Sequence, residues 1–277
     1  MSNFTPMKSF VLTYRFLALA ALVTSLWGCD GSTTYQVKTE ILRIDSLSEI
    51  VTIHDSLVKP ILYRNISGLD QLPFYQAKAK FISAILPSIL VAKHQLHNTK
   101  MKIEKLRAKS TWTKSDTVYY HEAKRRYKAK NIDDLINRLI TLPNSVVLAQ
   151  AAIETGWGES RFFIQASNLF GIWSYDEKES RIAAGKTRSD KTIYLRSYDD
   201  MSGSITDYFD VLARHHAYKK LRDARLSTSN PYVLANHLKN YSERKDWYTR
   251  QLKRVIRQNK LTKYDSYRLD PAYLMIE

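Results

Sequence analysis

Several features are scarce in this sequence of 277 residues, and each absence excludes a class of protein or site. The single cysteine rules out a disulfide bond within the chain. No GxGxxG, Walker, HExxH or paired CxxC motif occurs, so we expect no cofactor and no metal. No tandem repeat is evident. No compact arginine-rich arm or nucleic-acid-binding motif stands out, which argues against nucleic acid as a partner.

Acidic residues are in deficit. The chain has 43 Lys and Arg against 27 Asp and Glu, a formal net charge of +16. Such a chain favours anionic partners, which include nucleic acid, anionic lipid headgroups and anionic polymers. The hydrophobic content of 44% is enough for a real core, in one large domain or a domain with an appendage.

The N-terminus resembles an export signal. Two basic residues precede the apolar run Phe16–Trp27, which is too short to span a bilayer comfortably. The run ends in Leu26-Trp27-Gly28-Cys29, which resembles a bacterial lipobox, although Trp27 is larger than usual there. We predict a lipoprotein signal peptide over residues 1–28 and lipidation of Cys29, with the protein membrane-anchored in the cell envelope and facing the periplasm. An uncleaved signal anchor, or a cytosolic protein with an apolar N-terminus, is the alternative.

The middle of the chain divides into a linker and a helical extension. Residues 29–73 are predicted to form a membrane-proximal stalk, in which Ile41–Ile53 fits either a strand or a short helix. The domain is predicted over 74–277, with an N-terminal helical extension over 74–140. Within that extension, residues 74–109 have apolar positions at helical spacing, and Pro87 is expected to kink the helix or to start a new one.

Helical patterns also dominate the rest of the domain. Residues 117–142 show a second helical stripe, and Asn144 or Ser145 can cap the helix that follows. Residues 173–200 read as a small β-hairpin lobe around the strand-like sequence IYLRSY. From Ser202 onward the chain is helical again. The fold class is therefore predicted to be mainly α (α+β), a helical domain with a small β-lobe.

One acid stands out in the sequence VVLAQAAIETGWGES (146–160). Glu154 shares a helix face with Gln150 and Ala151, and the alanines around it predict a central, closely packed helix. An unpaired charge on such a helix costs several kcal/mol, unless the carboxyl lies at a cleft or has a raised pKa. Both situations suit a general acid. A solvated or salt-bridged glutamate at a helix end is the simpler interpretation, and spacing alone favours it.

The motif around Glu154 resembles a known family. QAAIETGWGESRF (150–162), followed by SNLFGIW (167–173), is similar to the glucosaminidase family of peptidoglycan hydrolases, and most similar to its Bax-type branch. Further similarity upstream and downstream extends the resemblance over roughly residues 74–265. The resemblance implies a lysozyme-like fold and an endo-β-N-acetylglucosaminidase that cleaves peptidoglycan glycan strands. We expect a monomer.

The resemblance also implies site residues. Glu154 falls on the general acid and Tyr218 on a tyrosine that closes the site beside the substrate. Substrate-binding positions are then Asn168, Leu169, Phe170, Gly171, Trp173 and Tyr198. In physical terms the aromatic rings offer flat faces to sugars, and Asn168 can hydrogen-bond an acetamido group.

A second catalytic group is where the sequence departs from the family. Many glucosaminidases have a glutamate in the β-lobe, often within a threonine-rich strand, and no acid here has that setting. Of Asp176, Glu177 and Glu179, we choose Glu179. Alternatively, the acetamido oxygen of the substrate assists and no protein base is needed.

Other functions remain open at this stage. One alternative is that a chain with the same fold is a muramidase or a lytic transglycosylase. It would otherwise be a non-catalytic cell-wall-binding lipoprotein, or, more distantly, a basic nucleic-acid binder.

Overall fold

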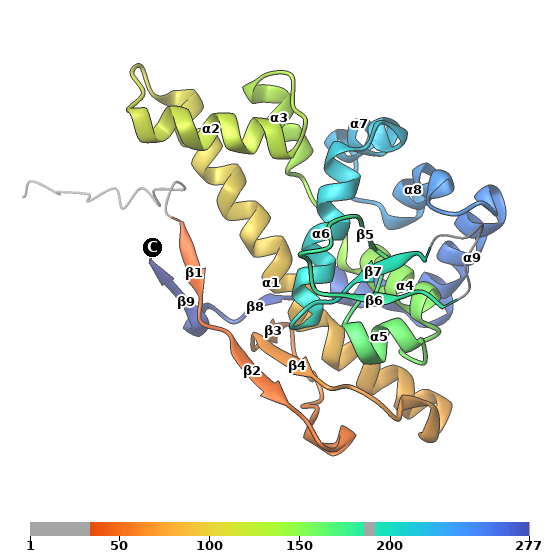
Figure 1. The fold of residues 1–277 in the computed structure, drawn as a ribbon. Coiled ribbons are helices and arrows are strands. Elements are labelled where there is room, and N and C mark those ends of the chain that lie inside the picture. The colour runs from red at the N-terminus through yellow and green to blue at the C-terminus, as the bar shows by residue number, and fades with distance from the viewer. Residues whose placement is uncertain (1–33, 186–191, 277) are drawn as a thin grey trace, which may run out of the picture. The chain divides into compact units, whose positions relative to one another are not determined.

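The computed structural model describes residues 34–185 and 192–276, and every structural statement below refers to them (Figure 1). The predicted signal peptide and Cys29 lie outside the described residues. The α-helices are α1 (Phe74–Ala108), α2 (Lys114–Arg126), α3 (Ile132–Arg138), α4 (Asn144–Thr155), α5 (Arg161–Ala166), α6 (Met201–Arg214), α7 (Lys219–Ser227), α8 (Pro231–Ala235) and α9 (Lys245–Gln258).

Short 3-10 helices and strands connect them. The 3-10 helices are η1 (Leu47–Glu49), η2 (Leu69–Gln71), η3 (His216–Tyr218), η4 (Asn236–Tyr241), η5 (Leu261–Ser266) and η6 (Pro271–Tyr273). The strands are β1 (Tyr35–Val37), β2 (Glu40–Arg43), β3 (Leu57–Val58), β4 (Ile61–Arg64), β5 (Trp173–Ser174), β6 (Arg181–Ala183), β7 (Tyr194–Arg196), β8 (Arg268–Leu269) and β9 (Leu274–Ile276).

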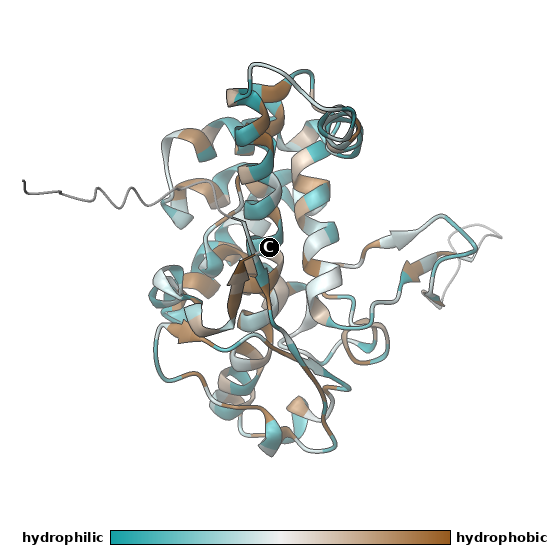
Figure 2. Cartoon of the chain, turned by 90° about the vertical axis from the view of Figure 1, so that its left-hand side faces the viewer, coloured by the Kyte–Doolittle hydropathy of each residue, from teal (hydrophilic) through white to brown (hydrophobic). Residues whose placement is uncertain are grey.

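Helix α1 is the long element around which the fold is assembled. It matches the predicted span 74–109 but runs as one helix through Pro87. Residues 81–92 of α1 are buried, so packing on several sides holds the helix together where proline removes a backbone donor. Figure 2 shows both hydrophobic and hydrophilic residues along the long helices.

Helix α4 lies at the centre of the core, as the alanine-rich sequence predicts. Residues 144–152 are all buried, and α4 contacts α1, α9 and η5. The start of α4 is capped from far along the chain, because Asp265 accepts hydrogen bonds from the backbone N–H and hydroxyl of Ser145, at 2.7 and 2.8 Å. The Asn144 amide donates to the carbonyl of Tyr264 at 2.7 Å instead of capping the helix.

Residues 34–73 are part of the packed domain, which corrects the prediction of a stalk for this part of the chain. Strand β1 pairs antiparallel with β9, β2 pairs parallel with β4, and β3 pairs parallel with β8. Apolar residues of this segment join the main core, among them Ile44, Ile50, Tyr63, Ile66 and Leu69. The strands are too short for a periodic signal, and two of these pairings join β1 and β3 to strands near the C-terminal end of the chain.

The predicted β-lobe is present as a three-stranded sheet of order β5-β7-β6, in which both pairings are antiparallel. A second, smaller hydrophobic cluster joins the C-terminal part of α1 to α2 and α3, and it includes Ile103, Leu106, Tyr127 and Leu135. The predicted stripe over 117–142 is therefore two helices. The expected architecture of a mainly helical domain with a small β-lobe is confirmed.

Candidate active site

Glu154 lies near the C-terminal end of the buried helix α4, where its side chain reaches solvent. Ala151 and Ala152 are buried, whereas Glu154 is exposed. No basic side chain of the described residues lies within ion-pair distance of its carboxyl group. This acid is therefore neither neutralised by a salt bridge nor sealed in the core.

The Gly156-Trp157-Gly158 turn ends α4 in one sharp change of direction. All three residues have positive φ angles, of 61°, 62° and 95°. A Cβ atom on Gly158 would lie 2.5 Å from Cδ1 of Leu69, so glycine is required there for space as well as for backbone conformation. The Trp157 ring packs edge-on against Phe81 with centroids 5.5 Å apart. The turn is thus locked to α1, which fixes where α4 ends.

A chain of hydrogen bonds supports the carboxyl group of Glu154. The Tyr248 hydroxyl donates to Oε1 of Glu154 at 2.9 Å and accepts from Nε2 of Gln150 at 3.0 Å. The Tyr208 hydroxyl in turn donates to Oε1 of Gln150 at 2.5 Å. Gln150, Tyr208 and Tyr248 are all buried. Three helices, α4, α6 and α9, therefore hold one carboxyl group in place.

Tyrosine rings surround the same carboxyl group. Tyr241 stacks on Tyr248 with centroids 5.7 Å apart and lies 6.5 Å from Tyr218. Burial and the negative charge of Glu154 together raise the pKa of Tyr218 to about 12. The same two causes raise the pKa of Tyr241 well above its usual value. These tyrosines are neutral at physiological pH, so the surroundings of Glu154 are polar but uncharged.

The pKa of Glu154 itself is raised. Removal of water by the surrounding protein is the larger cause, and the hydrogen bond from Tyr248 partly opposes it by stabilising the carboxylate. The side chain still reaches solvent, so the shift comes from partial desolvation. A carboxyl group that keeps its proton to higher pH and remains accessible can act as an acid.

The buried side chain of Asn168 holds the loop over residues 168–171 in place through hydrogen bonds to the backbone. Its side-chain amide donates to the carbonyls of Ile172 and Arg196, at 3.0 and 2.9 Å, and its carbonyl accepts from the backbone N–H of Ile172 at 3.0 Å. Asn168 is 1% exposed. The residue ties the loop to β7, and these bonds differ from the predicted hydrogen bond to an acetamido group. Leu169 is also buried, whereas Gly171 is exposed.

The predicted aromatic platforms divide into two kinds. Phe170 is buried and stacks on Tyr208 with centroids 4.2 Å apart, and the hydroxyl of Tyr198 donates to Asp207 at 2.8 Å. Trp173, by contrast, is 50% exposed, and the exposed ring of Tyr175 lies 6.1 Å from it. Of the predicted platforms on the loop and β-lobe, only Trp173 presents a large accessible ring among the described residues.

Glu179 is engaged by its neighbours in the β-lobe. One carboxylate oxygen accepts from Arg196 at 2.6 Å and the other accepts from the Ser174 hydroxyl at 2.9 Å. Arg196 also pairs with Asp207 at 2.7 Å. No hydrogen bond or ion pair joins Glu179 to Glu154 in the described part of the chain. Nearby, Glu177 pairs with Arg181 and is strongly exposed.

Sequence reasoning missed the contribution of α9. Tyr241, at the end of η4, and Tyr248, in α9, lie in the segment YSERKDWY, in which no motif assigns a role to either tyrosine. Gln150 was placed on the same helix face as Glu154, and this signal alone pointed to a neighbour of the acid. The contact between α4 and α9 is not visible in the sequence pattern.

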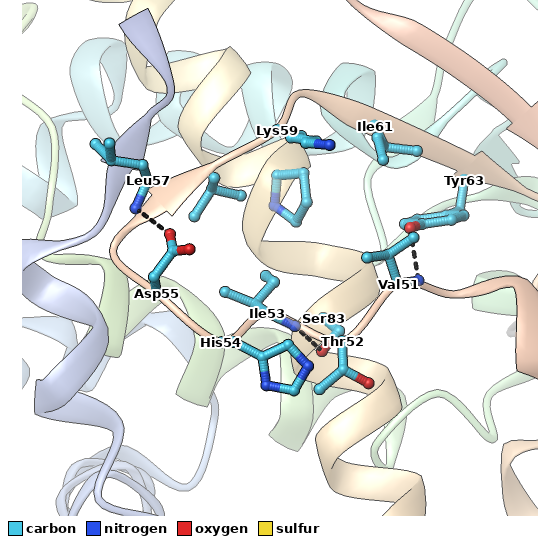
Figure 3. A pocket seen from close by; sticks show the side chains of 12 residues that line it. Val51, Thr52, Ile53, His54, Asp55, Leu57, Lys59, Ile61, Tyr63 and Ser83 are labelled. Carbon is cyan, nitrogen blue, oxygen red and sulfur yellow. Dashed lines mark hydrogen bonds between the residues drawn. The ribbon is translucent and has the colours of Figure 1, made fainter.

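A separate cavity lies between residues 51–63 and α1, as Figure 3 shows. Its volume is about 150 Å³, and its lining includes Ile53, Ser83 and Pro87 but none of the predicted site residues. The backbone N–H of Ile53 donates to the Ser83 hydroxyl at 3.4 Å across this cavity. Within residues 34–185 and 192–276 no group of His, Cys, Asp and Glu is arranged to hold a metal ion. No helix in these ranges has the length and apolar character needed to cross a membrane.

Comparison with known proteins shows one family to which part of the chain is similar. Residues 129–261, just under half of the chain, match the model of the Glucosaminidase family, described as mannosyl-glycoprotein endo-beta-N-acetylglucosaminidase. The matched segment includes Glu154, the loop 168–171 and Tyr218, so this part of the chain is similar to that family.

The chain also has low sequence identity to individual known proteins. The chain is 24% identical over 196 residues to Protein bax of Escherichia coli (strain K12), covering 66% of this chain and 69% of that protein. Among solved structures it is similar to a peptidoglycan hydrolase from Sphingomonas sp. A1, with 24% identity, 52% and 85% of the two chains covered and a TM-score of 0.37. It is also similar to the catalytic domain of the autolysin Auto from Listeria monocytogenes, with 21% identity, 58% and 94% covered and a TM-score of 0.39.

Proposed function

We propose that this protein is a peptidoglycan hydrolase of the endo-β-N-acetylglucosaminidase type, with Glu154 as its general acid. One observation carries the proposal: an accessible carboxyl group with a raised pKa is held by Tyr248 at the end of a buried helix. The family match over residues 129–261 supports the glycosidase class. Peptidoglycan as the substrate is proposed from the two motifs around Glu154 and Asn168 and from the net charge of +16, which suits a wall rich in carboxylates.

In the proposed reaction Glu154 gives its proton to the glycosidic oxygen as the bond breaks. Its raised pKa keeps the proton on the carboxyl group at higher pH than for an ordinary glutamate. Tyr248 fixes the orientation of the carboxyl group through Oε1. Oε2, for which the described residues show no hydrogen bond, is the oxygen proposed to face the substrate. Trp173, which is 50% exposed, is the proposed contact for a sugar ring. Tyr218 is only 7% exposed, and its proposed role is to close the site beside Glu154.

The second role in the reaction is proposed to belong to the substrate. Both oxygens of Glu179 are occupied by Arg196 and Ser174, so this acid is poorly placed to move freely toward a sugar. The acetamido oxygen of the substrate then assists at the anomeric carbon, and a water molecule completes hydrolysis. Glu179 acts in this scheme by holding Arg196 and the β-lobe in place.

The decisive experiment compares Glu154→Gln with the matched control Glu159→Gln, an exposed acid in the turn after α4. Glu154→Gln keeps the shape of the side chain and removes the proton, so release of fragments from purified sacculi should fall by about 10²–10⁴-fold. The control should keep normal activity. Near-normal turnover in Glu154→Gln contradicts the mechanism, and so does wild-type protein that binds sacculi but releases no fragments.

The same variant has a second expected property. Because the pKa of Glu154 is raised in the folded protein, ionisation of this group costs folding free energy once the pH exceeds that pKa. Glu154→Gln is therefore expected to be at least as stable as the wild type at neutral pH and above. Thermal unfolding at several pH values checks this and separates loss of catalysis from loss of folding.

A lytic transglycosylase is the second candidate. Among the described residues no other carboxylate contacts Glu154, and ring closure by the substrate needs no base that activates water. Mass analysis of the products decides the bond specificity. A reducing-end N-acetylglucosamine supports the glucosaminidase, a reducing-end muramic acid indicates a muramidase, and an anhydro-muramic end indicates the transglycosylase.

The location proposed for this activity is the cell envelope, with the chain anchored through a lipid on Cys29. The lipobox-like sequence Leu26–Cys29 supports this proposal. Labelling with a radioactive fatty acid should mark the wild type and leave Cys29→Ser unlabelled. A wild-type chain without label contradicts the anchor but leaves the hydrolase proposal intact.

A further inference from the structure

The positive charge of the chain is concentrated in one structural unit. Residues 100–130 contain eleven Lys or Arg and three Asp or Glu, a net charge of +8 out of +16 for the whole chain. They comprise the C-terminal part of α1, the turn that follows, α2 and the residues leading to α3, and are called here the basic arm. Nearly all of the basic arm precedes the family match, which begins at residue 129.

The basic arm has its own packing. Tyr127 and Ala123 of the arm are buried against Ile103, Leu106 and residues of α3 in the smaller hydrophobic cluster. Figure 1 shows α2 and α3 beside the C-terminal part of α1, apart from the sheet β5-β7-β6. The apolar side of α2 is thus used for folding, and the opposite side is the one offered to a partner.

That opposite side is basic and open. Lys114, Val118, His121 and Arg125 follow one another at intervals of four, three and four residues, so they share one face of α2, and all four are exposed. Lys128 is exposed just beyond the helix. Elsewhere in the arm, cations are paired with carboxylates, for example Lys109 with Asp116 at 2.9 Å.

The cations of this face lack such partners. In the described parts of the chain, no carboxylate lies within ion-pair distance of Lys114, Arg125 or Lys128. Uncompensated charges of one sign on a rigid helix repel one another, which costs folding free energy without any gain in packing. An anionic partner removes that repulsion, and a row of cations fits a partner with repeated negative charges.

The arm is poorly suited to insertion into lipid. Its most exposed large apolar residues are Val118 and Trp112. The indole N–H of Trp112 donates to the carbonyl of Leu106 at 2.8 Å, and its ring packs on Tyr120 with centroids 5.0 Å apart. A helix that lies in a membrane surface needs a broad free apolar face, which α2 does not have. Binding through charge alone is what this face offers.

We propose that the basic arm is a docking site for a polymer that carries repeated carboxylates, and that this polymer is the peptide-substituted glycan on which the proposed hydrolase acts. The choice of polymer rests on the proposed function. The arm holds the anionic strand by its carboxylates, and Glu154 acts on the sugar chain. Docking raises the local concentration of strands without taking part in bond cleavage.

The test uses the full-length chain in neutral detergent, with Glu154→Gln present so that sacculi are not degraded during binding. The arm variant is Lys114→Glu/Arg125→Glu/Lys128→Glu. The control Lys38→Glu/Arg43→Glu/Lys59→Glu changes the net charge equally at exposed positions of the N-terminal segment. The arm variant should bind sacculi at least about tenfold more weakly at low salt, and the control should bind nearly as the wild type does.

Two conditions sharpen the result. In about 0.5 M salt, where the Debye length is roughly 4 Å, the difference between the two variants should largely disappear. Sacculi whose carboxylates have been converted to amides should bind wild type as weakly as intact sacculi bind the arm variant. Equal loss in arm and control variants overturns the proposal, because net charge alone then explains binding. Undiminished binding to amidated sacculi also overturns it.

Activity distinguishes failure of this inference from failure of the proposed function. With Glu154 restored, the arm variant should cleave short soluble glycan fragments without attached peptides at the wild-type rate and lose activity only on sacculi. Vesicles of phosphatidylglycerol and phosphatidylcholine provide the competing surface. Tighter arm-dependent binding to these vesicles than to sacculi refutes the polymer and assigns the arm to lipid.

Discussion

Replacement of Tyr248 by Phe isolates the hydroxyl group that joins the core to the candidate acid. The hydroxyl accepts from Nε2 of Gln150, which is fully buried, and donates to Oε1 of Glu154. Loss of an acceptor from a buried donor costs about 1–3 kcal/mol. For a domain of this size that corresponds to a fall of roughly 2–10 °C in Tm, which differential scanning calorimetry measures directly.

The same substitution is expected to shift the pH dependence of activity in a defined direction. The Tyr248 hydrogen bond lowers the pKa of Glu154, so its removal raises that pKa further. A general acid works while it is protonated, and kcat/KM falls as the pH rises through its pKa in the free enzyme. Tyr248→Phe should therefore move the alkaline limb of the profile of kcat/KM against pH to higher pH, when measured on a soluble glycan.

Tyr208→Phe is the matched control. The Tyr208 hydroxyl donates to Oε1 of Gln150 and makes no hydrogen bond to Glu154. Its removal should lower Tm by a similar amount while the alkaline limb stays close to its wild-type position. If the limb moves to lower pH in Tyr248→Phe, or moves equally in both variants, the assignment of Glu154 as the acid supported by Tyr248 is refuted.

Two further predictions concern the turn and the β-lobe. Gly158→Ala places a methyl group 2.5 Å from Cδ1 of Leu69 at a φ of 95°, so it should lower the free energy of unfolding by about 2–4 kcal/mol in urea denaturation. Gly171→Ala, where nothing lies within 4 Å of the added atom, should cost only the backbone strain of about 1–2 kcal/mol, and equal losses in the two variants would argue against the packing explanation. Glu179→Gln should reduce kcat on a soluble glycan by less than about tenfold, because Glu179 is proposed to position Arg196 and not to transfer a proton. A loss as large as that in Glu154→Gln would instead identify Glu179 as the second catalytic group.

The elements that the sequence predicts best are those whose signals are local. The span of α1 follows from apolar residues at helical spacing. Asn230 caps α8 with Pro231 in its first turn, a local pattern that is typical of helix starts. The break between α2 and α3 also has a local signal: the side chain of Asn131 accepts from the backbone N–H of Asp134, as a helix cap does.

Features that depend on distant residues could not be predicted. The cap of α4 comes from Asp265, about 120 residues further along the chain than Ser145. Strand β1 consists of three residues, and its partner β9 lies at the other end of the described chain. Strands this short leave no periodic pattern of apolar residues in the sequence, which is why the sequence of residues 34–73 favours a linker.

In the candidate site, too, the local features could be predicted from the sequence and the contacts between distant residues could not. The sequence motif led to Glu154 and to the loop of Asn168, but not to what each side chain does inside the fold. Asn168 is polar and close to the site in sequence, so it suggested a ligand contact, whereas the structure uses its whole amide group to hold the loop. The tyrosines of α6 and α9 needed the three-dimensional packing to bring them to Glu154.

The pairing of β1 with β9 gives the fold a defined path for mechanical force. A pull on the chain at Thr34 acts first on the three residue pairs between β1 and β9, and next on the β2–β4 pair, before it reaches α1. If residues before Thr34 tether the protein, tension from a moving cell wall is taken up by these short strands. The tyrosines around Glu154 lie on other elements and take no part in these strand pairings.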